Sequence, residues 1–201
     1  MTTEIYCVRH GQSVHNQKQT IAGQLDSELT PLGFEDARSV ANALGRSDFD
    51  IVYCSDLLRA RQTAETIMNT LRVSCPVVYS PLIRELDYGR FTEKPVTETF
   101  QVLNYKRVPD QSYPGGESFN DLQERVREFL GQVLDESAGK RILVAAHAGS
   151  IRLIAMLLDP ERRQEHLDRA YGNRFIGKAV VNDHNSLVTF EVMQNPERGG
   201  F

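Results

Sequence analysis

Four short runs of β-forming residues, none with polar alternation, constrain the fold of this chain more than any other feature. They occupy residues 5–8, 50–54, 77–79 and 142–146. Runs of this kind are typical of strands buried on both faces of a mostly parallel sheet. The sequence therefore predicts an α/β fold built on such a sheet.

Helix signals separate these runs. Thr30 and Pro31 match an N-cap followed by proline at the first helical position, and apolar residues recur at helical spacing until Gly45. Other helices are expected after Ser55 or Asp56, near Ser118, and from about Ser150 to Leu158. Because strands alternate with helices, we expect three layers, with helices on both sides of the sheet.

One segment interrupts this alternation. Residues 92–116 are polar and rich in Pro and Gly, with only a weak helical pattern near residues 98–103. We interpret them as an insertion over the sheet edge that forms a lid on the active site. Residues 187–192 predict a final strand of mixed orientation. The whole chain, residues 1–201, is expected to form a single domain.

Composition excludes several classes of protein. The net charge is −4 and the pI is near 5.8, so nothing indicates a nucleic-acid-binding surface. No apolar stretch approaches the roughly 18 residues that would span a membrane, and residues 1–4 do not resemble a secretory signal. Three cysteines without CxxC spacing predict neither a disulfide framework nor a zinc site. We expect a cytoplasmic protein, with Cys7 and Cys54 as small core residues.

Charged and imidazole side chains follow the predicted strands. Arg9 and His10 follow the first strand, Arg59 and Arg61 the second, Glu85 the third and His147 the fourth. In open α/β sheets, ligands bind outside the carboxyl ends of the strands. Arg59 and Arg61 cannot share a helix face, and we favour Arg59 because it lies in the first turn.

This set of residues suits a phosphoryl group. Arginine forks match phosphate oxygens, and helix N-termini direct N–H groups at anions. A neutral imidazole can attack phosphorus and form a covalent intermediate, while a carboxylic acid can protonate the departing oxygen.

The segment from Val8 to Asn16, which contains Arg9-His10-Gly11, resembles the signature of the histidine phosphatase superfamily, phosphoglycerate-mutase-like branch. Five further segments are similar to those of this family in the expected order. They are residues 23–33, 55–64, 84–86, 114–118 and 144–149.

The resemblance implies roles for individual residues. His10 would be the nucleophile that becomes phosphohistidine, and Glu85 the proton donor. Arg9, Arg59, His147 and Asn16 would bind the phosphoryl oxygens, and Gly23 would belong to the loop over the substrate. The family needs no metal and no organic cofactor for the phosphatase reaction. One departure concerns Glu93, where a second glycine is expected after Gly89, and it puts the substrate subclass in doubt.

The leading hypothesis is a cofactor-independent phosphatase acting on a small phosphomonoester. The alternatives are a phosphoglycerate mutase-type isomerase, which must keep water out with a closing lid, and a protein that binds phosphorylated ligands without turnover. The substrate stays open among metabolites, sugar phosphates, nucleotides and phosphoproteins, and the sequence does not indicate the oligomeric state.

Overall fold

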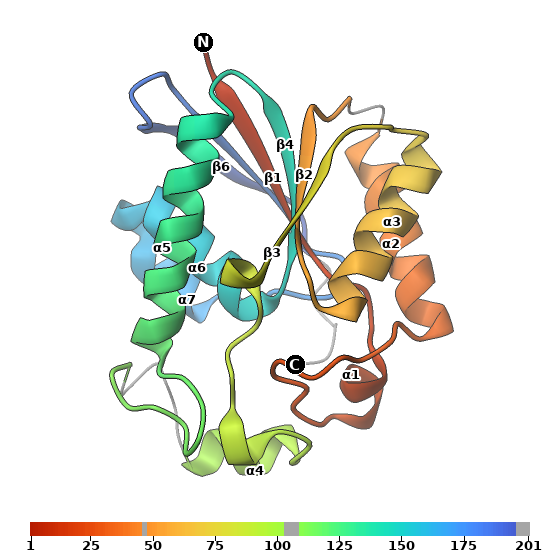
Figure 1. Cartoon of the computed structure of the whole chain (residues 1–201), viewed down its shortest axis with the longest axis vertical. Helices are drawn as coiled ribbons and strands as arrows, with labels where there is room; N and C mark the ends of the chain where they lie inside the picture. The colour runs from red at the N-terminus through yellow and green to blue at the C-terminus, as the bar shows by residue number, and fades with distance from the viewer. Residues whose placement is uncertain (46–47, 103–108, 196–201) are drawn as a thin grey trace.

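The computed structural model describes residues 1–45, 48–102 and 109–195. Six strands of this part of the chain form one sheet in the order β3-β2-β4-β1-β5-β6 (Figure 1). The strands are β1 (Thr3–Arg9), β2 (Ile51–Ser55), β3 (Val77–Ser80), β4 (Arg141–Ala146), β5 (Ile176–Val181) and β6 (Leu187–Gln194). The first four pair in parallel, whereas β5 and β6 are antiparallel to their neighbours. The predicted α/β fold with a mostly parallel sheet is confirmed.

Helices cover both faces of the sheet (Figure 1). One face is covered by α2 (Pro31–Leu44) and α3 (Leu58–Leu71), and the other by α5 (Phe119–Glu136), α6 (Ala148–Leu158) and α7 (Arg163–Asp168). Successive side chains of a strand point to opposite faces. Accordingly, Tyr6 and Val8 join the core under α2 and α3, while Ile5 and Cys7 join the core under α5 and α6. These two cores produce the predicted three layers.

The helix starts follow from local capping. Thr30 Oγ1 accepts the Gly33 N–H at 3.1 Å, and Ser118 exchanges hydrogen bonds with Asp121 at 2.8 and 3.1 Å. Helix α6 begins at Ala148, two residues before the expected start, so that His147 is its N-cap residue. The strand β4 therefore passes into a helix directly at His147.

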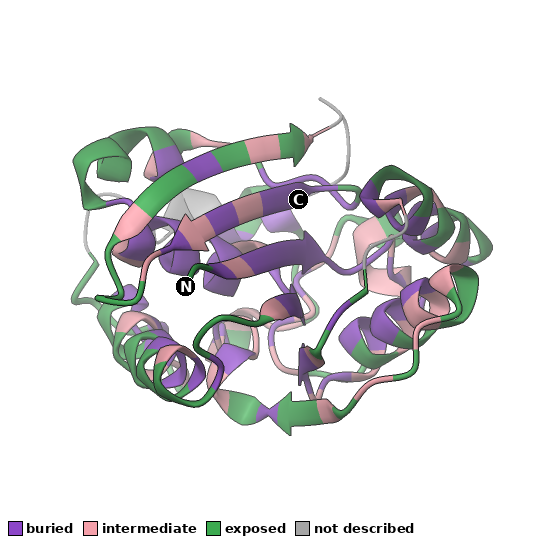
Figure 2. Cartoon of the chain, turned by 90° about the horizontal axis from the view of Figure 1, so that it is seen from above, coloured by how far each residue is buried: buried purple, intermediate pink, exposed green. Residues whose placement is uncertain are grey.

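One strand and two α-helices were missed by the sequence analysis, and one strand was described wrongly. Strand β5 and the five-residue helix α1 (Val14–Lys18) had no clear signal, and neither did the short helix α7. Strand β3 is not buried on both faces, because it forms an edge of the sheet and exposes Val78 and Tyr79. Figure 2 shows this contrast between the mainly buried central strands and the exposed edge strands.

A 3₁₀ turn, η2 (Gly89–Phe91), precedes the expected insertion, which contains the helix α4 (Val96–Val102). Residues 103–108 of the insertion lie outside the described residues. Figure 1 places α4 beyond the carboxyl ends of the parallel strands. The backbone of Glu93 and Lys94 is hydrogen-bonded to that of Ile21, at 2.7 and 2.9 Å, which ties this segment to the loop after α1. Among the described residues, no helix is long and apolar enough to cross a bilayer.

Candidate active site

Strand register brings the two predicted imidazoles together. Strands β1 and β4 are parallel neighbours, and Arg9 pairs with Ala146 at their carboxyl ends. The next residue on each strand is a histidine, so His10 and His147 leave the sheet side by side. Their ring centroids are 5.1 Å apart, and both side chains are almost completely buried.

His10 presents a lone pair at Nε2. Its Nδ1 lies 2.8 Å from the Gly11 carbonyl oxygen, which can only accept, so we assign the ring proton to Nδ1. Burial, together with the charges of Arg59 and Arg9, holds the His10 pKa well below 6.5. The imidazole is therefore neutral at physiological pH, with Nε2 as its available nucleophilic atom.

Arg59 is fixed against His10 from the first turn of α3. Its Nε donates to His10 Nε2 at 3.2 Å, and its two terminal nitrogens donate to the carbonyl oxygens of Leu25 and Gly23 at 2.9 and 2.8 Å. The side chain is only 1% exposed, whereas Arg61, two residues on, is exposed. Of the two arginines considered in the sequence, Arg59 is the one that faces His10.

Two buried guanidinium groups give the site a positive charge. Arg9 lies at the end of β1 and donates to the Tyr171 carbonyl oxygen. Burial lowers the pKa of Arg9 and of Arg59 to about 10, and the Glu85 carboxylate opposes this shift in both. The neighbouring charges of Arg152 and Arg9 lower the pKa of Arg9 and Arg59, respectively. Both groups stay charged at neutral pH. An anion bound between them would offset part of the cost of burying two like charges.

His147 receives its orientation from Ser55, at the end of β2. Its Nε2 lies 2.8 Å from Ser55 Oγ, which also accepts the Leu57 N–H at 3.4 Å. Either atom can donate in this contact, and the tautomer of His147 decides which. The other ring nitrogen, Nδ1, is buried at the start of α6, where His147 is the N-cap residue. Burial and Arg59 hold the His147 pKa well below 6.5.

Glu85 reaches the site from the chain that follows β3 and the 3₁₀ turn η1 (Pro81–Ile83). Its Oε1 accepts the Leu86 N–H at 2.9 Å, and its Oε2 accepts the Gly149 N–H at 3.2 Å. A Cβ atom on Gly149 would lie 2.2 Å from Glu85 Oε1. The absence of a side chain at position 149 therefore leaves room for the carboxylate at the start of α6.

Asn16 and Gly23 complete the predicted set. The amide of Asn173 donates to the His10 carbonyl oxygen at 2.9 Å and to Asn16 Oδ1 at 3.2 Å, so Asn16 lies next to the His10 backbone. The Gly23 carbonyl oxygen accepts from Arg59, and its φ of +52° is a conformation that favours glycine. All seven predicted site residues thus belong to one region at the carboxyl ends of β1, β2 and β4.

Sequence reasoning missed two residues of this region. Ser55 ends β2 beside His147, and its position two residues before a helix N-cap was interpreted only as a helix signal. Asn173 precedes β5, a strand that the sequence did not predict. A prediction of the strand order would have placed Ser55, at the end of β2, beside His147, after the neighbouring strand β4. No sequence pattern indicated Asn173.

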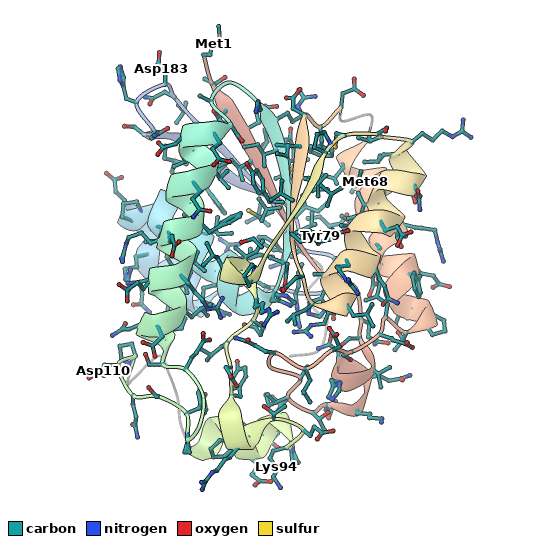
Figure 3. The ribbon with its side chains drawn as sticks, in the orientation of Figure 1. Met1, Met68, Tyr79, Lys94, Asp110 and Asp183 are labelled. Carbon is teal, nitrogen blue, oxygen red and sulfur yellow. The ribbon has the colours of Figure 1, made fainter. Side chains whose placement is uncertain are left out.

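Charged side chains also occur further from this region. Lys94 is exposed and lies beside α4, beyond the carboxyl ends of the strands (Figure 3). Within the described ranges, no group of three His, Cys, Asp or Glu residues has a geometry that could hold a metal ion. The ligand that the buried donors suit best is an anion.

Comparison with known proteins identifies the family. Residues 5–178 match the model of the histidine phosphatase superfamily (branch 1), and the chain belongs to this superfamily of enzymes.

Curated relatives carry both phosphatase and mutase names. A protein of Hydrogenobacter thermophilus named "Putative phosphoserine phosphatase 2" is 36% identical over 160 residues, which cover 77% of each chain. A 2,3-bisphosphoglycerate-dependent phosphoglycerate mutase of Sinorhizobium fredii is 34% identical over 182 residues, covering 84% of this chain and 85% of that one. Among solved structures, the alpha-ribazole phosphatase from Shigella flexneri has a TM-score of 0.82 at 22% identity and covers 98% of both chains, a likeness of fold.

Proposed function

We propose that this chain is a cofactor-independent phosphatase that hydrolyses a small phosphomonoester through a phosphohistidine on His10. The observation that carries the proposal is the neutral, buried His10, whose Nε2 lone pair lies beside the Arg59 guanidinium and opposite His147. A ligand that only needs to be bound does not require such a nucleophile.

In the first step, His10 Nε2 attacks phosphorus and the bond between phosphorus and the ester oxygen breaks. Glu85, in its acid form, donates its proton to that oxygen, and the alcohol leaves. In the second step, water attacks the phosphohistidine and the bond between phosphorus and Nε2 breaks. The Glu85 carboxylate takes the proton of the water, which restores the enzyme and releases phosphate.

Arg9, Arg59 and the His147 imidazole would hold the phosphoryl oxygens, with Asn16 as a further donor. Preorganised donors of this kind supply most of the catalysis of phosphoryl transfer. Gly23 would keep the loop over the substrate in contact with Arg59. We further propose that residues 1–201 act as one domain, since all described strands join one sheet, and that the chain works in the cytoplasm, where its three free thiols stay reduced.

The proposal is tested with a panel of phosphomonoesters in the presence of a chelator. Wild type should release phosphate from at least one ester, and His10→Ala should abolish the release while it keeps the circular dichroism spectrum of wild type. The exposed His184 offers a matched control, because His184→Ala should retain full activity. Tight vanadate binding without turnover of any ester would instead identify a phospho-ligand-binding protein.

A mutase is the second candidate, because curated relatives at 33–36% identity include several 2,3-bisphosphoglycerate-dependent phosphoglycerate mutases. Such an enzyme returns the phosphoryl group to another hydroxyl of the substrate before water reaches it. Incubation with 3-phosphoglycerate and a trace of 2,3-bisphosphoglycerate separates the two activities. Isomerisation faster than phosphate release would reject the phosphatase.

A further inference from the structure

We propose that Arg125 and Glu117 are positioning residues for the proton donor Glu85, and we name this pair the Glu117–Arg125 clamp. The inference rests on the proposed function, since it assigns Glu85 the role of the acid. It also gives a purpose to the Pro-Gly-Gly-Glu-Ser segment at residues 114–118, for which the proposed mechanism has no role.

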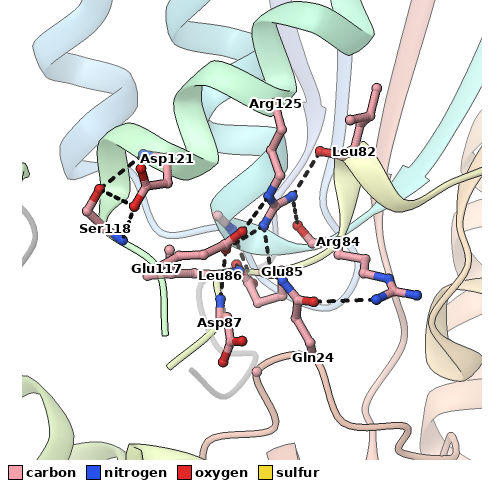
Figure 4. Close-up of polar contacts among 12 residues, drawn as sticks. Gln24, Leu82, Arg84, Glu85, Leu86, Asp87, Glu117, Ser118, Asp121 and Arg125 are labelled. Atoms are coloured by element: carbon pink, nitrogen blue, oxygen red, sulfur yellow. Dashed lines mark hydrogen bonds and ion pairs between the residues drawn. The ribbon is translucent and has the colours of Figure 1, made fainter. Parts of the chain in front are cut away.

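Arg125, on α5, uses every N–H direction of its guanidinium group (Figure 4). Its Nη1 donates to the carbonyl oxygens of Leu82 and Arg84, both at 2.8 Å, and its Nη2 donates to that of Glu85 at 2.9 Å. Its Nε and Nη2 also donate to the two carboxylate oxygens of Glu117, both at 2.9 Å. One side chain therefore holds three carbonyl groups of the turn that carries the acid.

These carbonyl groups need a partner for a structural reason. The 3₁₀ turn η1 ends at Ile83, so neither the Leu82 carbonyl, at its end, nor those of Arg84 and Glu85, beyond it, have a partner within the turn. Arg125 satisfies them with a rigid planar fork, which a lysine cannot reproduce. The clamp thus selects one backbone path from Leu82 to Glu85.

Glu117 fixes the chain on the other side of the acid. Its Oε2 accepts the Asp87 N–H at 3.0 Å, and its own N–H donates to the Asp87 carbonyl oxygen at 2.9 Å. A Cβ atom on Gly116 would lie only 2.3 Å from that same oxygen, so the contact requires glycine. Glu85 is consequently held between two anchored residues, Arg84 and Asp87.

The side chains of the clamp are only 15% and 24% exposed, and their ion-pair distance is 2.9 Å. Their hydrogen bonds reach the Glu85 backbone, whereas the Glu85 carboxylate is bonded to the N–H groups of Leu86 and Gly149. The clamp therefore acts on the reaction through the placement of Glu85.

The test compares two esters that differ in their need for an acid. The alkoxide of an alkyl phosphate is a poor leaving group and depends on proton donation, whereas the dinitrophenolate of 2,4-dinitrophenyl phosphate departs without it. Arg125→Lys should lower kcat/KM for the alkyl ester about 10- to 100-fold, the scale expected of a misplaced catalytic group, and that for the dinitrophenyl ester less than about threefold. Glu117→Gln, which retains the shape of the side chain, should show the same pattern in a milder form.

Glu85→Gln should lower kcat/KM for the alkyl ester more strongly, again with little effect on the dinitrophenyl ester. Adding Arg125→Lys to Glu85→Gln should not lower kcat/KM for the alkyl ester further, because the two residues act through one group. The exposed Arg127, on the same helix, supplies the matched control Arg127→Lys, with unchanged kinetics. An equal loss of kcat/KM for both esters, or additive losses in the double variant, would overturn the proposed role of the clamp.

If Arg125→Lys does not fold, Glu117→Gln alone tests the clamp, by the same ratio of the kcat/KM values for the two esters. The failure of the clamp and that of the proposed function are distinguishable. If Glu85→Gln lowers kcat/KM selectively for the alkyl ester and the clamp variants do not, only the proposed role of the clamp is rejected. If Glu85→Gln is itself unselective, the assignment of the acid fails, and the clamp fails with it.

Discussion

Gly149→Ala should shift the Glu85 carboxylate while it leaves the stability of the fold almost unchanged. A Cβ atom at this position would lie 2.2 Å from Glu85 Oε1 and 3.2 Å from a methyl carbon of Leu122. An ordinary C···O contact is about 3.3 Å or longer, so the carboxylate must move by roughly 1 Å. It is the end of a flexible side chain, and the move costs the fold little, but it disturbs the 3.2 Å hydrogen bond from the Gly149 N–H.

A displacement of this size by a catalytic group costs on the order of 100-fold in rate. We therefore expect kcat/KM for an alkyl phosphate to fall by about this factor in Gly149→Ala, while vanadate inhibition changes little. Gly131→Ala on α5 is the matched control, because no atom lies within 4 Å of the added Cβ. It should stabilise the protein by about 0.5–1 kcal/mol and leave kcat/KM unchanged. Wild-type kinetics in Gly149→Ala would refute this reasoning.

Three further predictions concern the anion site. Ser55→Ala removes the hydroxyl that hydrogen-bonds His147 and should weaken vanadate binding about tenfold, measured by inhibition; unchanged inhibition would show that Ser55 does not orient His147. Because burial and Arg59 depress the pKa of His10 and His147, the unfolded chain binds more protons below pH 6.5. The free energy of unfolding, measured with urea, should then fall as the pH drops from about 6.5, by up to ~1.4 kcal/mol per pH unit for each histidine. His10→Asn should flatten this dependence, and a parallel profile would contradict the assignment. Inorganic phosphate at about 100 times its Kd should stabilise the chain by roughly 2.7 kcal/mol, seen as a rise in Tm that chloride at equal ionic strength does not produce.

The parallel part of the fold was predictable because the runs that form its strands are β-forming and lack polar alternation. Strand β5 escaped prediction, since Gly177 and Lys178 interrupt its apolar residues. The exposure of β3 follows from its place at the sheet edge, which is a property of strand order and not of the residues in the strand.

Five of the candidate site residues were predictable because each follows a strand or begins a helix, whereas Asn16 and Gly23 came only from the resemblance to the family. The contacts that orient these residues were not. Arg125 and Ser55 act through partners 40 or more residues away along the chain, and the pattern around each is that of an ordinary helix or strand end. Only the strand register and the helix packing bring such pairs together.

Glu93 shows how a departure from a family pattern can preserve the backbone. Its φ is +67°, a conformation that favours the glycine expected there from the resemblance. Its N–H still donates to the Ile21 carbonyl oxygen at 2.7 Å. The substitution therefore changes the exposed side chain on the segment beyond the strands and leaves the path of the chain intact.

The most direct test of the account is a rapid-quench experiment with a ³²P-labelled substrate, followed by mapping of the labelled residue. We expect a label on His10 that is stable in base and lost in acid, that forms at least as fast as turnover, and that is absent from His10→Ala. A label on another residue, or steady turnover by His10→Ala, would show that the two imidazoles and the buried guanidinium groups do not do the chemistry assigned to them.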